Sequence, residues 1–314
     1  MAKVISSSGL SDETCLPSPL HYIPPRTHHD DCIQEAYTLL FPVLEDLFSK
    51  TTISPRDVDV LVLNCSGFCP SPSLSAIIVN GFAMHQRVKT FNISGMGCSA
   101  SAISLDVART LLQVHRGSYA VVVSTEVLST GWYPGKDRRK LLLNCSFRTG
   151  SAAVLLSSKN EARGKSKYKL LHLVRSQRAS DDKAHQSAIR EEDSEGITGF
   201  TLERIYLKQV AMAALYLRAI LSSGKTPVPD FLSAVQHYCM PASWKAVIEE
   251  VGRGLGVGPN EMDPALTMFR RFGNQSSSSM WYQLAYLEAK GRVSKGERVW
   301  QLAIGSGPKC NSLV

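Results

Sequence analysis

Short apolar runs typical of buried strands alternate with helical patterns along most of this chain. The runs at residues 57–66 and 118–128 are rich in Val and Leu, as expected of strands that are covered on both faces. Between them, a short strand pattern at residues 90–94 continues into a glycine-rich turn and a helical pattern over residues 95–115. This alternation predicts an α/β fold with a largely buried sheet.

The second half of the chain has a similar order of elements, although no exact sequence repeat is present. Residues 159–196 are highly charged and polar, and they are predicted to form a surface hairpin with loops. The other predicted helices span residues 31–49, 74–86, 202–221, 246–256 and 276–293, the other strands span residues 151–158, 167–176, 237–240 and 298–307, and residues 222–230 are a predicted linker.

The composition is that of a folded protein with an excess of positive charge. Of the 314 residues, 44% are hydrophobic and 20% are charged, which excludes a disordered tail and a small disulfide scaffold. The net charge of +8 suits nucleic acid, a phosphate-bearing cofactor or a membrane surface. No apolar run reaches the roughly 18–20 residues of a membrane span.

The 8 cysteines are expected to be reduced thiols. The first residues contain no apolar segment typical of a signal peptide, which favours a reducing compartment. Cys65 and Cys69 have a C-x-x-x-C spacing, but no second Cys/His pair with ligand spacing follows. The run His28-His29-Asp30-Asp31 points its side chains apart, so no metal site is predicted.

The segment GMGCSASA, residues 95–102, surrounds Cys98 with small residues. Small residues at a strand-to-helix turn allow a second backbone or a substrate to approach closely. A cysteine at a helix N-terminus faces the positive end of the helix dipole, which favours the thiolate. Cys98 is therefore either an acyl-accepting nucleophile or a small buried residue at a tight junction.

Two further segments have both a structural and a functional interpretation. Asn274 precedes a run of serines and a predicted helix, so it is either a helix cap or an amide donor that faces a carbonyl. Gly305, Ser306 and Gly307 follow a predicted strand, and this loop could cradle a phosphate or a thioester.

These segments closely resemble plant 3-ketoacyl-CoA synthases, the condensing enzymes of very-long-chain fatty acid elongation. GMGCSA and FGNQSSSSMWYQLAYLEAKGR carry the resemblance most specifically, and SPRDVDVLVLNCS, VVVSTE, LLLNCSFRTG and VWQLAIGSGPKCNS extend it along almost the whole chain. The resemblance implies a thiolase-like fold, a layered α-β-α-β-α sandwich of two similar halves that each hold a mixed five-stranded sheet. The halves are expected at residues 1–165, with the nucleophilic cysteine, and 166–314, with the equivalents of the His and Asn loops.

The resemblance also implies a reaction. A long acyl chain moves from CoA to the cysteine, malonyl-CoA loses carbon dioxide, and the resulting carbanion attacks the acyl thioester. Acyl-CoA and malonyl-CoA are the implied substrates, with no cofactor, no metal and no nucleic acid. A homodimer, or a heterodimer with related synthases, is expected. The family implies the cytosolic face of the endoplasmic reticulum membrane, and without a membrane-spanning pattern this chain is expected there peripherally or in the cytosol.

The resemblance assigns roles to single residues. Cys98 falls on the nucleophile, and Asn274 falls on the asparagine that stabilises the thioester enolate by hydrogen bonding. The catalytic histidine, the second His of an H-F-C-x-H-A-G-G-R run, falls on Pro241, while the first His of that run is retained as His237.

Other family histidines and glycines are also replaced. Gln177 and Arg270 stand at two further histidine positions, and Ser243 and Trp244 stand at the two glycines of the histidine run. Trp244 is expected to crowd the loop beside the thiol.

Proline offers neither a base nor a donor, and losing a general acid/base group costs roughly 10²–10⁴ in rate. His237 lies four positions earlier on a predicted strand, about 13 Å away, which is beyond hydrogen-bonding reach of position 241. Two hypotheses follow: the chain is a 3-ketoacyl-CoA synthase that works through Cys98 and Asn274, or it is a catalytically impaired or dead member that acts as a binding or regulatory partner of an active synthase.

Overall fold

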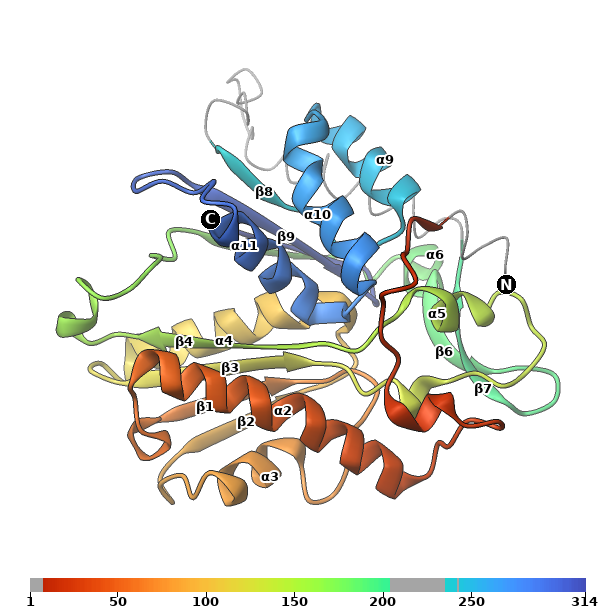
Figure 1. The fold of residues 1–314 in the computed structure, drawn as a ribbon, viewed down its shortest axis with the longest axis horizontal. Helices are drawn as coiled ribbons and strands as arrows, with labels where there is room; N and C mark the ends of the chain where they lie inside the picture. Colours follow the sequence, from red (N-terminus) through yellow and green to blue (C-terminus); the bar gives the residue numbers. More distant parts are fainter. Residues whose placement is uncertain (1–7, 204–234, 242) are drawn as a thin grey trace.

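The computed structural model describes residues 8–203, 235–241 and 243–314, and Figure 1 shows the arrangement of their helices and strands. The α-helices are α2 (His29–Thr51), α3 (Leu74–Gly81), α4 (Ala100–Val114), α5 (Leu141–Ser146), α6 (Asp182–His185), α9 (Lys245–Leu255), α10 (Pro259–Phe272) and α11 (Ser279–Ala289). The strands are β1 (Val60–Asn64), β2 (Lys89–Ile93), β3 (Tyr119–Thr125), β4 (Ser151–Ser157), β5 (Leu173–Gln177), β6 (Ala188–Glu192), β7 (Thr198–Leu202), β8 (His237–Cys239), β9 (Val299–Gly305) and β10 (Lys309–Leu313).

The first sheet has the strand order β2-β1-β3-β4. Strand β1 pairs in parallel with β2 and β3, and β4 closes the sheet antiparallel to β3. All five residues of β1 are buried, because alternate side chains contact helices on opposite faces. Leu61 and Leu63 belong to a cluster with α2 and α3, whereas Val60 and Val62 belong to a cluster with α4.

The second sheet has the order β5-β10-β9-β8, in which β8 runs parallel to β9 and the other pairs are antiparallel. One face packs on α9 and α10 through a cluster that includes Trp300 and Phe269. The other face contributes Ala303 and Leu313 to the cluster of α4 and α11, which also holds residues of β1 and β3. Helices α4 and α11 therefore lie between the two sheets.

This packing gives five layers, with α2 and α3 on one outer side and α9 and α10 on the other (Figure 1). The predicted α-β-α-β-α sandwich is confirmed. Each sheet has four strands among the described residues, where the family resemblance implied five. The predicted helix over residues 202–221 and the linker at 222–230 fall mainly on residues 204–234, outside the described part of the chain.

Several local predictions differ from the structure. The strand predicted over residues 167–176 begins only at Leu173, and the charged region ends in a hairpin of β6 and β7. Helix α10 was not predicted, because Pro259 and Pro264 interrupt its pattern. Pro259 nevertheless fits the first helical position, where no backbone donor is needed. Strand β10 was missed because Lys309–Leu313 is largely polar, although pairing with both β5 and β9 buries it.

Within the described residues, no helix combines the length and the apolar character needed to cross a bilayer. No group of three or more His, Cys, Asp or Glu side chains in this part of the chain is arranged to hold a metal ion.

Candidate active site

Cys98 lies in a 3₁₀ turn, η3 (Gly97–Ser99), which leads directly into α4. This turn packs against the end of β9, which belongs to the second sheet. A β-carbon on Gly97 would lie 2.8 Å from the backbone nitrogen of Ser306, and one on Gly305 would lie 2.3 Å from the carbonyl oxygen of Met96. Both positions therefore require glycine, and the small residues around Cys98 serve the close approach of two backbones.

Gly305 is the last residue of β9, and Ser306 and Gly307 lie in the turn of the β9–β10 hairpin. The Lys309 ammonium donates to the carbonyl oxygens of Ser306 and Gly307, each at 3.1 Å. Burial lowers the pKa of Lys309. The Lys309 ammonium therefore bonds to the backbone of this loop. The loop packs against the Cys98 turn.

A serine and a glutamate accompany Cys98. Ser276, the first residue of a second 3₁₀ turn, η6 (Ser276–Ser278), has its Oγ 3.6 Å from Cys98 Sγ and 3.4 Å from Glu126 Oε2. Its φ of 55° lies in the left-handed region, a conformation that costs a non-glycine residue about 1–3 kcal/mol. Such strain is found where a side chain must be held in one position.

Glu126 directly follows β3, and its carboxylate is fixed at the end of the first sheet. The backbone N–H of Gly67 donates to Oε1 at 2.7 Å, and that of Ser66 donates to Oε2 at 3.2 Å. The Cys65 thiol donates to Oε1 at 3.5 Å. Sequence reasoning missed Glu126 as a site residue, although an acidic residue immediately after a buried strand was a usable signal.

The environment of Cys98 disfavours its thiolate. Burial raises the pKa of the thiol to about 11, the hydrogen bond from Ser276 acts to lower it, and the charge of Glu126 adds to the increase. The thiolate that the helix dipole was expected to favour is thus not favoured here, because desolvation has the largest effect on the thiol. Burial also raises the pKa of Glu126, against the lowering effect of its backbone hydrogen bonds.

Asn274 is buried at the start of the same segment. Its Oδ1 accepts the N–H of Ser276 at 2.7 Å, and its backbone forms an isolated parallel bridge with Phe147. This bond closes a local turn ahead of η6, whose N-cap is Gln275, so Asn274 is not the helix cap that the sequence offered as one alternative. The bond also fixes the amide beside the turn that presents Ser276 to Cys98.

The retained His237 is far from the thiol. It is the first residue of β8 and pairs with Val299, the first residue of β9. Gly305, which contacts the Cys98 turn, lies six positions further along β9, about 20 Å from Val299. The His237 Nε2 lies 2.8 Å from Glu297 Oε2. Pro241 is buried just beyond the end of β8, after Met240, whose backbone N–H and C=O both bond to the Gln283 amide at 2.7 Å.

The other replaced positions are spread over the second half. Gln177 is exposed at the end of β5. Lys309 of β10 pairs with Gln177 on one side and with Gly305 on the other, so the backbones of Gln177 and Gly305 lie two strand spacings, about 10 Å, apart. Arg270 is exposed on α10. Trp244, expected to crowd the thiol, packs instead on the apolar cluster of β8, α9 and α10.

Two charged features lie outside this site. Lys140 of the basic loop at 136–140 is buried and bonds to Glu191 and Thr201 of the β6–β7 hairpin.

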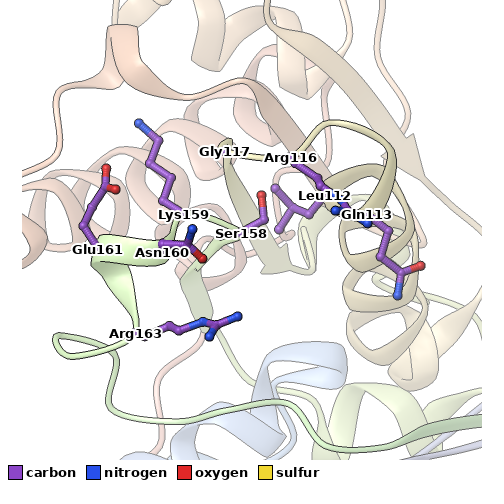
Figure 2. A pocket seen from close by; sticks show the side chains of 9 residues that line it. All are labelled: Leu112, Gln113, Arg116, Gly117, Ser158, Lys159, Asn160, Glu161 and Arg163. Atoms are coloured by element: carbon purple, nitrogen blue, oxygen red, sulfur yellow. The ribbon is translucent and has the colours of Figure 1, made fainter.

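A cavity of about 590 Å³ is lined by Leu112, Arg116, Lys159 and Arg163 among others (Figure 2). It adjoins the C-terminal end of α4, and Cys98 precedes the N-terminal end, about 20 Å away.

Comparison with known proteins identifies similar sequences. A family model described as FAE1/Type III polyketide synthase-like protein matches residues 1–228. 3-Ketoacyl-CoA synthase 5 of Arabidopsis thaliana is 42% identical over 336 residues, which cover 99% of this chain and 68% of that protein. 3-Ketoacyl-CoA synthase 9 of the same plant is 44% identical over 336 residues, with 99% and 66% covered. The chain thus spans about two thirds of the length of these relatives.

Solved structures with the same fold include 1,3,6,8-tetrahydroxynaphthalene synthase from Streptomyces coelicolor A3(2), a bacterial type III polyketide synthase. It has a TM-score of 0.85 at 17% identity and covers 99% of this chain and 87% of its own. CsyB complexed with CoA-SH has a TM-score of 0.78 at 15% identity, with 99% and 88% covered. These similarities confirm the thiolase-like fold.

Proposed function

The chain belongs to the FAE1/type III polyketide synthase-like family, and from this membership we propose that it is a 3-ketoacyl-CoA synthase that condenses a long-chain acyl-CoA with malonyl-CoA. The observation that carries the proposal is the position of Cys98, on the turn of the first half that packs against the end of β9, beside Ser276 and the Gly305 hairpin. Relatives that are 42% and 44% identical are named 3-ketoacyl-CoA synthases, which supports the same reaction type.

In the proposed reaction, Cys98 Sγ bonds to the acyl carbonyl carbon and the CoA thiolate leaves. Malonyl-CoA then loses carbon dioxide, and its carbanion attacks the acyl carbon, which releases Cys98 and gives the 3-ketoacyl-CoA. The Asn274 amide, held in one orientation by the N–H of Ser276, stabilises the enolate by hydrogen bonding. The backbone amides at the start of α4 suit the oxyanion formed during acyl transfer.

The proposed substrates require no cofactor. The net charge of +8 suits the phosphates of CoA and an anionic membrane surface. By family, we propose a dimer, formed with a second copy or a related synthase, at the cytosolic face of the endoplasmic reticulum membrane.

An elongation assay with purified protein, a long-chain acyl-CoA and labelled malonyl-CoA tests the function. Product above the level of a Cys98→Ser variant supports the synthase. Equal, background product from both proteins overturns it, and the hypothesis of a catalytically dead partner of an active synthase then replaces it.

A further inference from the structure

We propose that Ser276 and Glu126 form the proton relay that serves Cys98, with Ser276 passing the thiol proton to the Glu126 carboxylate. The inference deepens the proposed condensation and rests on it. It answers a specific chemical need, because the position of the family's catalytic histidine holds Pro241, and His237 is about 20 Å away along the second sheet.

The position of the Ser276 hydroxyl between the Cys98 thiol and the Glu126 carboxylate supports the proposal. The Ser276 Oγ lies 3.6 Å from Cys98 Sγ and 3.4 Å from Glu126 Oε2, but a hydroxyl has a single proton. If Ser276 donates to the glutamate, the thiol can donate to Ser276. If Ser276 donates to the sulfur, the glutamic acid can donate to Ser276. These two arrangements are the start and the end of one proton transfer, and long contacts of this kind tighten when a substrate binds.

The relay is rigid at both ends. The backbone N–H groups of Ser66 and Gly67 hold both oxygens of Glu126. The Asn274 side chain and a left-handed backbone hold Ser276. A strained residue that places its hydroxyl between a thiol and a carboxylate is what a positioned relay requires.

The surroundings of Glu126 suit a base. The polar groups that face its carboxylate are the Cys65 thiol, the Ser276 hydroxyl and the two backbone N–H groups, while the nearby Arg190 guanidinium donates to the carbonyl of Gly67 instead. No ion pair to Glu126 occurs among the described residues. Burial raises the pKa of both Glu126 and Cys98, so the carboxylate is a stronger base than an exposed one.

The proton balance closes over one catalytic cycle. During acyl loading, the Sγ–C bond forms, the thiol proton moves to Ser276 Oγ, and the hydroxyl proton moves to Glu126 Oε2. The CoA thiolate leaves and takes a proton from water. After condensation, the Cys98 thiolate leaves the acyl carbon and receives the stored proton back from Glu126 through Ser276.

The test measures single-turnover loading of labelled acyl-CoA onto Cys98, without malonyl-CoA, in the full chain. Glu126→Gln and Ser276→Ala are each expected to slow loading about 10²-fold near pH 7, and the double variant little further, because both remove the same relay. Ser278→Ala is the matched control, since the Ser278 hydroxyl donates to the Gln275 carbonyl in the same run and loading should persist.

The pH profile separates a relay from a structural role. Without a relay, loading depends on the preformed thiolate, so Glu126→Gln should gain about tenfold per pH unit between pH 7 and 9, while the wild-type rate should rise less steeply. If Glu126→Gln fails to fold, Ser276→Ala gives the same test without removing a buried charge. Wild-type loading with unchanged rates and profiles in the variants overturns the relay alone. Failure of the wild type to load Cys98 overturns the proposed function and the relay with it.

Discussion

Gly305 of the second sheet lies directly against the backbone of Met96, two residues before the proposed nucleophile. A β-carbon on Gly305 would lie 2.3 Å from the Met96 carbonyl oxygen and 2.8 Å from the backbone nitrogen of Ser99. Both neighbouring atoms belong to the backbone, so neither can rotate away. The second half of the chain thus fixes the position of a thiol that the first half carries.

Gly305→Ala is therefore expected to lower the free energy of unfolding by about 1–3 kcal/mol, because the new methyl group overpacks this junction. Displacement of the Cys98 turn should also slow acyl loading about 10²-fold. Thermal unfolding and single-turnover loading measure the two effects. Gly164→Ala is the control, since no atom lies within 4 Å of its added β-carbon, and it should change neither quantity. Equal behaviour of the two variants contradicts the contact.

Lys140→Met is expected to destabilise the protein by about 1–3 kcal/mol. The Lys140 side chain is 1% exposed, and its loss leaves the Thr201 hydroxyl oxygen without a donor and Glu191 without its lysine partner, although Thr201 still donates to Glu191. Chemical denaturation provides the measurement. Lys136→Met removes an exposed charge from the same loop and should stay within about 0.5 kcal/mol of the wild type. Similar losses in both variants indicate that the loop has no buried ion pair.

Titration of the Cys98 thiol should show a midpoint at about pH 11, since burial disfavours the charged thiolate. The ultraviolet thiolate absorbance of the wild type minus that of Cys98→Ser isolates this group. Glu126→Gln should move the midpoint down, because the negative charge that opposes the thiolate is removed. A wild-type midpoint at or below about 8.5, the ordinary cysteine value, contradicts the burial of the thiol.

Pro241→His tests whether the missing imidazole limits condensation. Pro241 follows β8 at the end nearer to the Gly305 junction, so a histidine there is expected to raise steady-state product formation at least about tenfold. Ser243→His, two residues further on, is the control for an added imidazole and should have no such effect. No gain from Pro241→His shows that another step limits the reaction.

Local pattern predicted the fold well and the site only in part. The apolar run from Val60 to Leu63 predicted the buried strand, and the small residues around Cys98 predicted the tight turn. Both features depend on residues that are neighbours in the sequence. The contact between Cys98 and Ser276 spans 178 positions, and that between Ser276 and Glu126 spans 150. No periodicity encodes such distances. The sequence pattern also failed to predict strand β10, because its residues are largely polar and are buried by pairing with neighbouring strands.

Synthesis of 3-ketoacyl-CoA from a long-chain acyl-CoA and labelled malonyl-CoA is the most direct test of the central claim. The wild-type chain should form this product and carry the acyl chain on Cys98 as an intermediate. The Cys98→Ser variant should form none. Wild-type product no greater than that of Cys98→Ser would contradict the assignment of a condensing function to this site.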